Sequence, residues 1–241
     1  MTETFVLISG ACHPGWTWRL VAQELRAAGH RVLAPDLPGL ADGDDPERYS
    51  LANVADFIVD LVEHHDLRAV TLVGHSWGGY PLTAAAPRLA PRLRRLVYWS
   101  AFVPAEDTPL IEEVPPSYAE MFRQVAAASG NNSIVFPLEV FRTAFMQDAD
   151  ESVQRMVHGL LVPQPLRYFT ETVTPIDPAA LGVPAAYVTS PDDLALPPGE
   201  LGWTPRFPQR LGAGTPVIEY AGSHEAQFTR PAELTAALLK A

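Results

Sequence analysis

Six consecutive residues organise this chain of 241 residues: Gly74-His75-Ser76-Trp77-Gly78-Gly79. A largely apolar run, 69–73, leads into the first glycine, and a helix-compatible segment rich in alanine follows the last one. The pattern Gly-x-Ser-x-Gly between a buried strand and a helix is typical of a nucleophile elbow, a strained turn that presents a serine side chain. The glycines let the turn close and let backbone pass beside the serine. Ser76 is therefore the candidate nucleophile.

Short apolar runs and helical patterns alternate on both sides of this turn. The runs predict strands at 5–9, 32–34, 69–73, 96–99, 185–189 and 216–220. They do not alternate with polar residues, as expected of parallel strands buried on both faces. Helices are predicted between them, including one that Ser50 caps and a closing helix at 231–239 with proline in its first turn. The fold class is therefore α/β, a mostly parallel sheet covered by helices on both faces.

The alternation stops in the segment 104–181. This segment shows no clear strand, only helical patterns such as 117–129 and 150–161, interrupted by prolines. Strands of one sheet flank it on both sides, so an insertion is expected rather than a separate domain. We therefore expect a single domain with its core at 1–103 and 182–241 and a helical lid inserted between the two parts.

Apolar residues recur at helical spacing within the expected lid. They are Met121, Phe122, Val125, Phe141, Phe145, Met156 and Val157. A lid over an active site should turn part of such a surface toward substrate, which makes Phe122 and Phe145 candidate substrate contacts. The alternative is that these side chains pack only on one another.

Composition narrows the classes of partner. The net charge is −11, with 28 acidic residues against 17 basic ones, whereas nucleic-acid binding draws on clustered Lys and Arg. No apolar run approaches the ~18 residues that a bilayer requires, and the acidic start lacks the pattern of a secretory signal. The lone Cys12 cannot form an internal disulfide. We expect a cytoplasmic protein that binds a small-molecule substrate, with a homodimer possible and neither nucleic acid nor membrane as a partner.

A serine hydroxyl needs a base that takes its proton, and an imidazole held by a carboxylate is the usual one. Of the seven histidines, only His158 and His224 follow Ser76. His158 falls in a helix of the expected lid, whereas His224 follows the last strand, at the edge of the sheet that faces the elbow. His224 is therefore the candidate base. The acid should follow the preceding strand, where Asp192 and Asp193 compete.

Two backbone amides are needed to bind a developing oxyanion. One should come from Trp77, next to the nucleophile, and the other from the loop after the first strand, where Ala11 is best placed. The indole of Trp77 either lines the acyl pocket or packs beneath the lid. His13, in the same loop as Ala11, is a further candidate substrate contact. No residue pattern indicates a cofactor or a metal.

Together these residues resemble the α/β-hydrolase superfamily, and more narrowly its methylesterase and hydroxynitrile lyase group. The resemblance covers nearly the whole chain outside the lid and rests on Gly10-Ala11-Cys12-His13 with Trp16-x-Trp18, Ala28-Gly29-His30-x-Val32 with Asp36-Leu37, the elbow itself, Ala101-Phe102-Val103-Pro104, and Ser223-His224 with Pro231. It implies an α/β-hydrolase fold with Ser76 as nucleophile, His224 as base and the amides of Ala11 and Trp77 as oxyanion hole. Because a proline lies four residues after the acid in that group, Pro197 favours Asp193 over Asp192.

Two departures from the group bear on the reaction. Ser9 stands where the group usually has histidine, and Glu225 follows His224 where the cyanogenic lyases carry a lysine. The second departure argues against lyase chemistry. We therefore expect a serine hydrolase that cleaves a small or medium, largely apolar ester through an acyl-enzyme. The alternatives are a hydroxynitrile-lyase-like carbon–carbon lyase, and a ligand-binding protein or receptor on a hydrolase scaffold.

Overall fold

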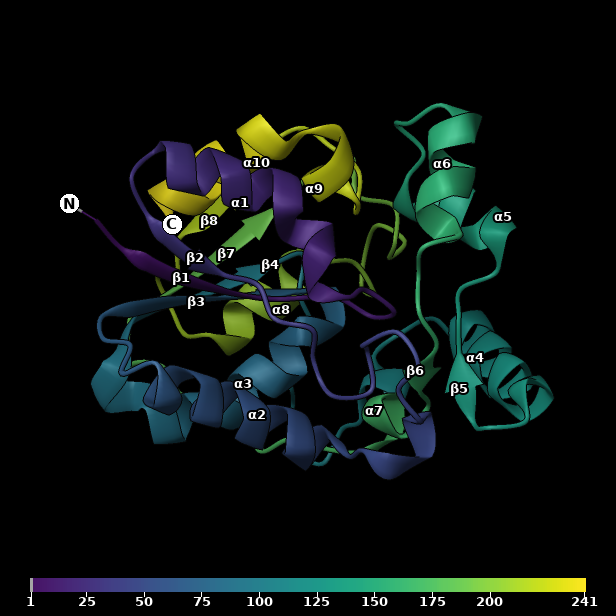
Figure 1. Ribbon diagram of the computed structural model, residues 1–241, viewed down its shortest axis with the longest axis horizontal. Helices are drawn as coiled ribbons and strands as arrows, with labels where there is room; N and C mark the ends of the chain where they lie inside the picture. Colours follow the sequence, from purple (N-terminus) through teal and green to yellow (C-terminus); the bar gives the residue numbers. More distant parts are fainter. Residues whose placement is uncertain (1) are drawn as a thin grey trace.

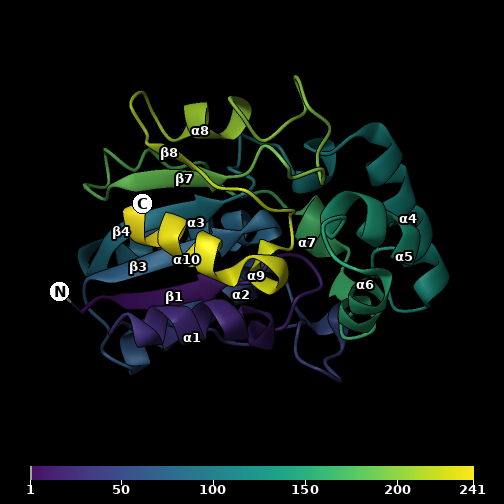
Figure 2. The same ribbon diagram turned by 90° about the horizontal axis from the view of Figure 1, so that it is seen from above.

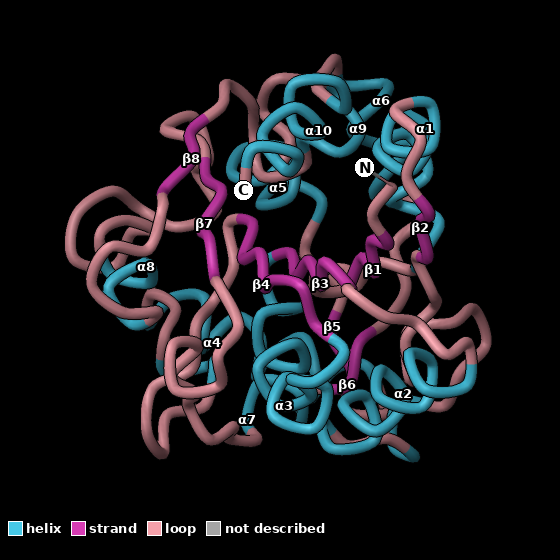
Figure 3. Tube along the Cα trace, turned by 90° about the vertical axis from the view of Figure 1, so that its left-hand side faces the viewer, coloured by secondary structure: helices cyan, strands magenta, loops and turns pink. Residues whose placement is uncertain are grey.

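A six-stranded, fully parallel sheet forms the centre of the computed structural model, which describes residues 2–241. Its strands are β1 (Thr4–Ile8), β2 (Arg31–Leu33), β3 (Val70–His75), β4 (Leu93–Trp99), β7 (Ala185–Thr189) and β8 (Val217–Glu219), in the order β2-β1-β3-β4-β7-β8 (Figures 1 and 3). The chain crosses from β2 over β1 to β3, so β3 lies in the interior of the sheet. The α/β fold expected from the sequence is confirmed.

Helices cover both faces of the sheet, as Figure 3 shows. The helices α1 (Arg19–Ala27) and α10 (Pro231–Lys240) pack on one face, and α2 (Leu51–His64) and α3 (Gly79–Leu89) pack on the other. Successive residues of β1 point to opposite faces, so Phe5 and Leu7 join the first layer, and Val6 and Ile8 the second. Both sides of the strand are therefore buried, which explains its uninterrupted apolar sequence. No helix within residues 2–241 is long and apolar enough to cross a membrane.

The expected ends of several elements agree with the structure. Strand β7 occupies the expected residues, and Ser50 caps α2 through a reciprocal pair of hydrogen bonds with Asn53. Strand β4 begins at Leu93, three residues before the expected start. The apolar pattern missed these residues because two of them are arginines. Arg95 there pairs with Glu3, with Nη2 2.9 Å from Oε2. The apolar pattern therefore detected only the carboxyl half of β4, which is the buried half.

The segment between β4 and β7 forms an insertion beyond the carboxyl ends of the strands (Figures 1 and 2). It contains α4 (Pro116–Ser129), α5 (Leu138–Val140), a π-helical turn at Phe141–Phe145, α6 (Glu151–His158) and α7 (Arg167–Thr170). The expectation that it holds no strand is wrong. Strands β5 (Ser133–Ile134) and β6 (Gln164–Pro165) pair antiparallel. Each is two residues long, too short to produce a period in the sequence, and one contains proline.

A buried carboxylate fastens the beginning of the insertion to the core. Glu113 is 1% exposed and pairs with two residues of α8 (Arg206–Arg210). Arg210 Nη1 lies 2.7 Å from Glu113 Oε1, and Arg206 donates to both the carboxylate and the backbone carbonyl of Glu113. Since a buried charge is tolerated only when paired, these contacts hold the insertion against the segment after β7.

Glu113→Gln should destabilise the protein, because both arginines lose their carboxylate partner in a partly desolvated site. We expect a loss of about 2 kcal/mol in the free energy of unfolding, less than for a fully buried pair because the arginines remain partly exposed. Urea denaturation measures it. The control is Glu112→Gln, one residue away at an exposed position. Equal stabilities of the two variants would contradict the role given to Glu113.

Candidate active site

The serine turn has the strained geometry expected of a nucleophile elbow. Ser76 follows β3 directly and has φ = 52°, a region that non-glycine residues rarely adopt. A Cβ at Gly74 would lie 2.8 Å from the carbonyl oxygen of Gly78, and a Cβ at Gly78 would lie 2.7 Å from that of Ser9. Both glycines are therefore required by close backbone approach, and Ser76 is held at the carboxyl end of an interior strand.

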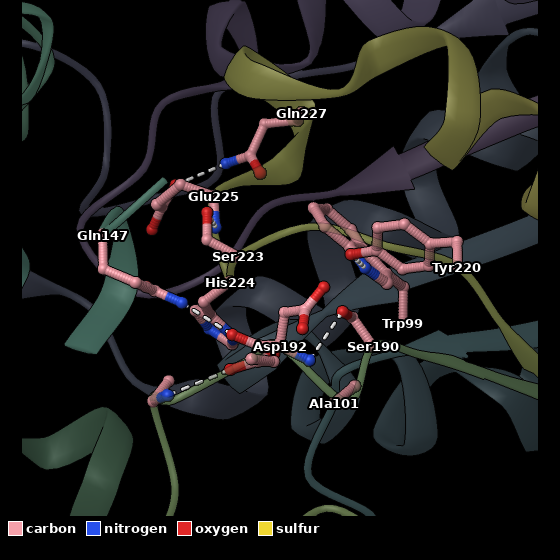
Figure 4. A network of polar contacts seen from close by, with 12 residues as sticks. Trp99, Ala101, Gln147, Ser190, Asp192, Tyr220, Ser223, His224, Glu225 and Gln227 are labelled. Atoms are coloured by element: carbon pink, nitrogen blue, oxygen red, sulfur yellow. Dashed lines mark hydrogen bonds and ion pairs between the residues drawn. The ribbon is translucent and has the colours of Figure 1, made fainter. Parts of the chain in front are cut away.

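His224 and Asp193 meet at the same edge of the sheet. His224 lies in the loop after β8, and its Nδ1 is 2.8 Å from Oδ2 of Asp193, in the loop after β7. The other carboxylate oxygen of Asp193 accepts a hydrogen bond from the Ala195 amide at 3.0 Å. Asp192 is exposed, and its backbone carbonyl accepts a hydrogen bond from Gln147 at 2.6 Å (Figure 4). Of the two competing aspartates, Asp193 is therefore the one that contacts His224.

The ring of His224 is enclosed by other rings. Trp203 stacks on it at 5.3 Å between centroids, and Phe145 of the insertion meets it edge-on at 5.2 Å. His75 lies 4.5 Å away on β3. These contacts leave the imidazole little freedom to rotate, so Asp193 and its neighbours fix its orientation.

Ser76 and His224 line the same cavity. Among the hydrogen bonds of residues 2–241, none joins Ser76 Oγ to the His224 ring. Bonds of this kind are often long until substrate is bound. The competing histidine, His158, donates from Nε2 to the carbonyl oxygen of Phe136 at 2.7 Å within the insertion, so it is committed there.

His75 stays uncharged beside the candidate base. Burial lowers its pKa well below the usual value, and the neighbouring His224 and His13 lower it further. Its ring stacks on Trp99 with centroids 3.9 Å apart. A neutral His75 adds no positive charge next to His224. On this side, His224 therefore faces uncharged rings.

The cavity holds about 350 Å³ of space between atoms, part of which is open to solvent. Its lining includes Ala11, Ser76, Trp77 and His224. The remaining wall is apolar or aromatic and consists of Phe102, Leu110, Val114, Tyr118, Phe122, Phe136, Phe145, Phe169, Ala195, Leu196 and Trp203. The shape and lining therefore suit a small, largely apolar group held with its polar end against Ser76.

Three of the four expected substrate contacts line this cavity: Trp77, Phe122 and Phe145. For Trp77 both alternatives hold, because its indole also donates to the carbonyl of Tyr168 at 3.2 Å and stacks on that ring at 5.1 Å. Tyr168 belongs to α7 of the insertion. The fully buried indole therefore joins the elbow to the insertion.

His13 does not line the cavity, contrary to the expectation from the sequence. Its Nδ1 lies 2.5 Å from the carbonyl oxygen of Ala11 and its Nε2 lies 3.0 Å from Oε2 of Glu225. Both ring nitrogens are thus occupied inside the protein. The loop position of His13 suggested a polar contact for substrate, but the acidic residue after His224 takes that contact instead.

Several wall residues escaped the sequence analysis. Trp203 lies in a loop between β7 and α8 with no regular pattern, and Tyr118 and Phe169 lie on separate helices of the insertion. Helical spacing groups residues that share one face of one helix, whereas this wall is assembled from several segments. Within residues 2–241, no three His, Cys, Asp or Glu side chains are grouped as metal ligands would be.

In a comparison with known proteins, the model of the alpha/beta hydrolase family matches residues 5–238 of this chain. The chain belongs to this family. A carbendazim hydrolyzing esterase from Nocardioides sp. (strain SG-4G) is 29% identical over 245 residues, which cover 95% of this chain and 96% of the relative. Methylesterase 1 of Arabidopsis thaliana is 27% identical over 261 residues, covering 99% and 95%.

Among solved structures, an extracellular alpha/beta-hydrolase from a Paenibacillus species has a TM-score of 0.94 and 29% identity, covering 99% of this chain and 98% of its own. That protein is described as sharing structural and functional homology with tobacco Salicylic Acid Binding Protein 2. Together with the methylesterases, these similarities assign the chain to the methylesterase group, as its motifs indicated. This alpha/beta hydrolase is therefore an ester-cleaving enzyme.

If Asp193 orients His224, Asp193→Asn should lower kcat for a p-nitrophenyl ester by about 10³- to 10⁴-fold, because the amide favours the wrong imidazole tautomer. Asp192→Asn is the matched control, one residue away, and should retain activity within about twofold, since the hydrogen bonds of Asp192 are made by its backbone amide and carbonyl and the residue is exposed. Steady-state kinetics with both variants tests this. The reverse ranking would transfer the role to Asp192.

Proposed function

We propose that this alpha/beta hydrolase cleaves small or medium, largely apolar esters through the triad Ser76, His224 and Asp193. The observation that carries the proposal is the 2.8 Å contact between His224 Nδ1 and Asp193 Oδ2, next to a cavity that Ser76 and aromatic side chains line. A bonded Nδ1 presents Nε2 as the free nitrogen of the neutral ring. That nitrogen is the one which can accept the proton of a serine hydroxyl.

In the first half of the reaction, Ser76 Oγ attacks the ester carbonyl while His224 takes its proton. The carbonyl oxygen becomes negative and is bound by the backbone amides of Ala11 and Trp77. His224 then gives the proton to the leaving alkoxide, and the acyl group remains on Ser76. Asp193 stabilises the imidazolium that forms between these two transfers.

In the second half, water takes the place of the alcohol. His224 removes a proton from the water, which attacks the acyl carbonyl, and the same two amides bind the oxyanion again. Collapse of this intermediate returns the proton to Ser76 Oγ and releases the carboxylic acid. No cofactor takes part in this sequence.

The apolar wall favours esters whose acyl or alcohol group is apolar. Phe122, Phe145 and Tyr118 of the insertion face the cavity together with Trp203 and Phe102 of the core, so the insertion acts as the lid of the site. Burial of an apolar group among these rings is worth roughly 25 cal/mol per Å². Charged groups would lose their hydration here without a partner, since the residues that line the cavity include no Lys, Arg, Asp or Glu.

Ser76→Ala should fold as the wild type does and lose at least about 10³-fold in kcat for p-nitrophenyl butyrate, because the covalent route is gone while binding remains. Thermal denaturation checks the fold and steady-state kinetics the rate. Retention of more than about a tenth of the wild-type rate, a loss under ~1.4 kcal/mol of barrier, would contradict the assignment.

The same preparations separate hydrolysis from the alternative lyase reaction. Cyanide release from mandelonitrile needs a cation that stabilises the developing cyanide, but the residues that line the cavity include no Lys or Arg, and Glu225 takes the position after His224. We expect the wild type to release no more cyanide than Ser76→Ala does. Cyanide release by the wild type that disappears in Ser76→Ala would favour the lyase instead.

A further inference from the structure

A buried ion pair lies directly behind the proposed catalytic groups. Glu225 follows His224 and is fully buried, and its Oε2 lies 3.0 Å from Nε2 of His13, itself 2% exposed. The same oxygen accepts a hydrogen bond from Gln227 Nε2 at 2.6 Å (Figure 4). His13 comes two residues after Ala11. The pair therefore joins the loop of the proposed base to the loop of a proposed oxyanion amide.

The second nitrogen of His13 completes this connection. Nδ1 donates to the carbonyl oxygen of Ala11 at 2.5 Å, while Nε2 donates to the carboxylate of Glu225. A carbonyl and a carboxylate both accept, so a His13 ring with protons on both nitrogens satisfies both contacts. Burial alone would lower the pKa of His13, but the charge and hydrogen bond of Glu225, with the bond to Ala11, outweigh burial and raise it.

Neither charge of the pair can be buried without the other. The backbone holds Glu225 in place, because its amide donates to the carbonyl oxygen of Phe145 at 3.1 Å. The loop that carries Ala11 is not a relaxed turn, since Cys12 has φ = 65°. On its other side this loop contacts the insertion, where the Cys12 amide donates to Gln164 Oε1 at 2.9 Å and its carbonyl accepts from the Val162 amide at 3.0 Å.

We propose that His13 and Glu225 are positioning residues, which hold the Ala11 amide at the distance from Ser76 and His224 that the oxyanion requires. This inference rests on the proposed function. Neither side chain lines the cavity, so neither touches substrate. Loss of the pair would let the Ala11 loop move relative to the elbow. The oxyanion exists only in the transition state and intermediates, so kcat falls while KM changes little.

Glu225→Gln tests this, because it keeps the size of the side chain and removes its charge. We expect kcat per active site to fall about 10- to 100-fold for p-nitrophenyl butyrate, with KM within about twofold of the wild type; loss of a whole oxyanion donor costs about 10²- to 10³-fold. Titration with a serine-directed phosphonate counts the active sites. The matched control is Glu233→Gln, which removes an exposed negative charge on α10 and should leave both constants unchanged.

Two further variants each remove one of the two hydrogen bonds of the His13 ring, either to Ala11 or to Glu225. His13→Asn keeps a donor near Ala11 but cannot reach Glu225, whereas His13→Gln reaches Glu225 and loses the bond to Ala11. Both should lower kcat with KM preserved, and either serves if Glu225→Gln does not fold.

Wild-type kcat per titrated site in Glu225→Gln and in both His13 variants would overturn the proposal, as would a loss confined to KM. Failure of the proposed function has a different signature, namely ester hydrolysis that survives in Ser76→Ala.

Discussion

The proposed active site depends on one strained residue, Ser76, at the end of an interior strand. A φ of 52° persists here only because contacts with the surrounding backbone constrain Ser76 to this conformation. Gly74 and Gly78 allow contacts with neighbouring backbone that a side chain would block, and the amide of Phe102 donates to the carbonyl of Ser76 at 3.1 Å. The strained turn is therefore held in place by the end of β1 on one side and by the loop after β4 on the other.

The parallel sheet brings the remaining groups to this turn. Because all six strands run in one direction, the loops after β1, β7 and β8 meet at the same edge as the elbow. Those loops carry Ala11, Asp193 and His224. Residues separated by more than 200 positions thus become neighbours without any long connection, and the buried contact between His13 and Glu225 joins two of these loops directly.

The insertion belongs to the site rather than lying beside it. It supplies Phe145 against the ring of His224, Tyr168 against the indole of Trp77, and Gln164 to the loop that carries Ala11. Glu113 anchors its first part to α8. The contacts are spread over the whole insertion, so changes in it should affect the geometry of the proposed base and the elbow as well as the cavity wall.

The sequence predicted those features that depend on a local pattern. The elbow, the strands and the cap at Ser50 each follow from adjacent residues, and the meeting of His224 with the loop after β7 follows from the parallel sheet. Asp193 could be chosen over Asp192 only through resemblance, because two adjacent aspartates in a turn look alike. Features that depend on distant residues were missed: strands β5 and β6, the stacking of Trp203 on His224, and the partner of His13.

The account requires that Ser76 be activated, since a strained turn and an aromatic cavity could also serve a protein that only binds ligands. Mass spectrometry after treatment with a serine-directed fluorophosphonate measures this most directly. We predict one adduct per chain, located at Ser76, formed rapidly in the wild type and far more slowly in Asp193→Asn. An unmodified Ser76 in folded wild-type protein would contradict the account.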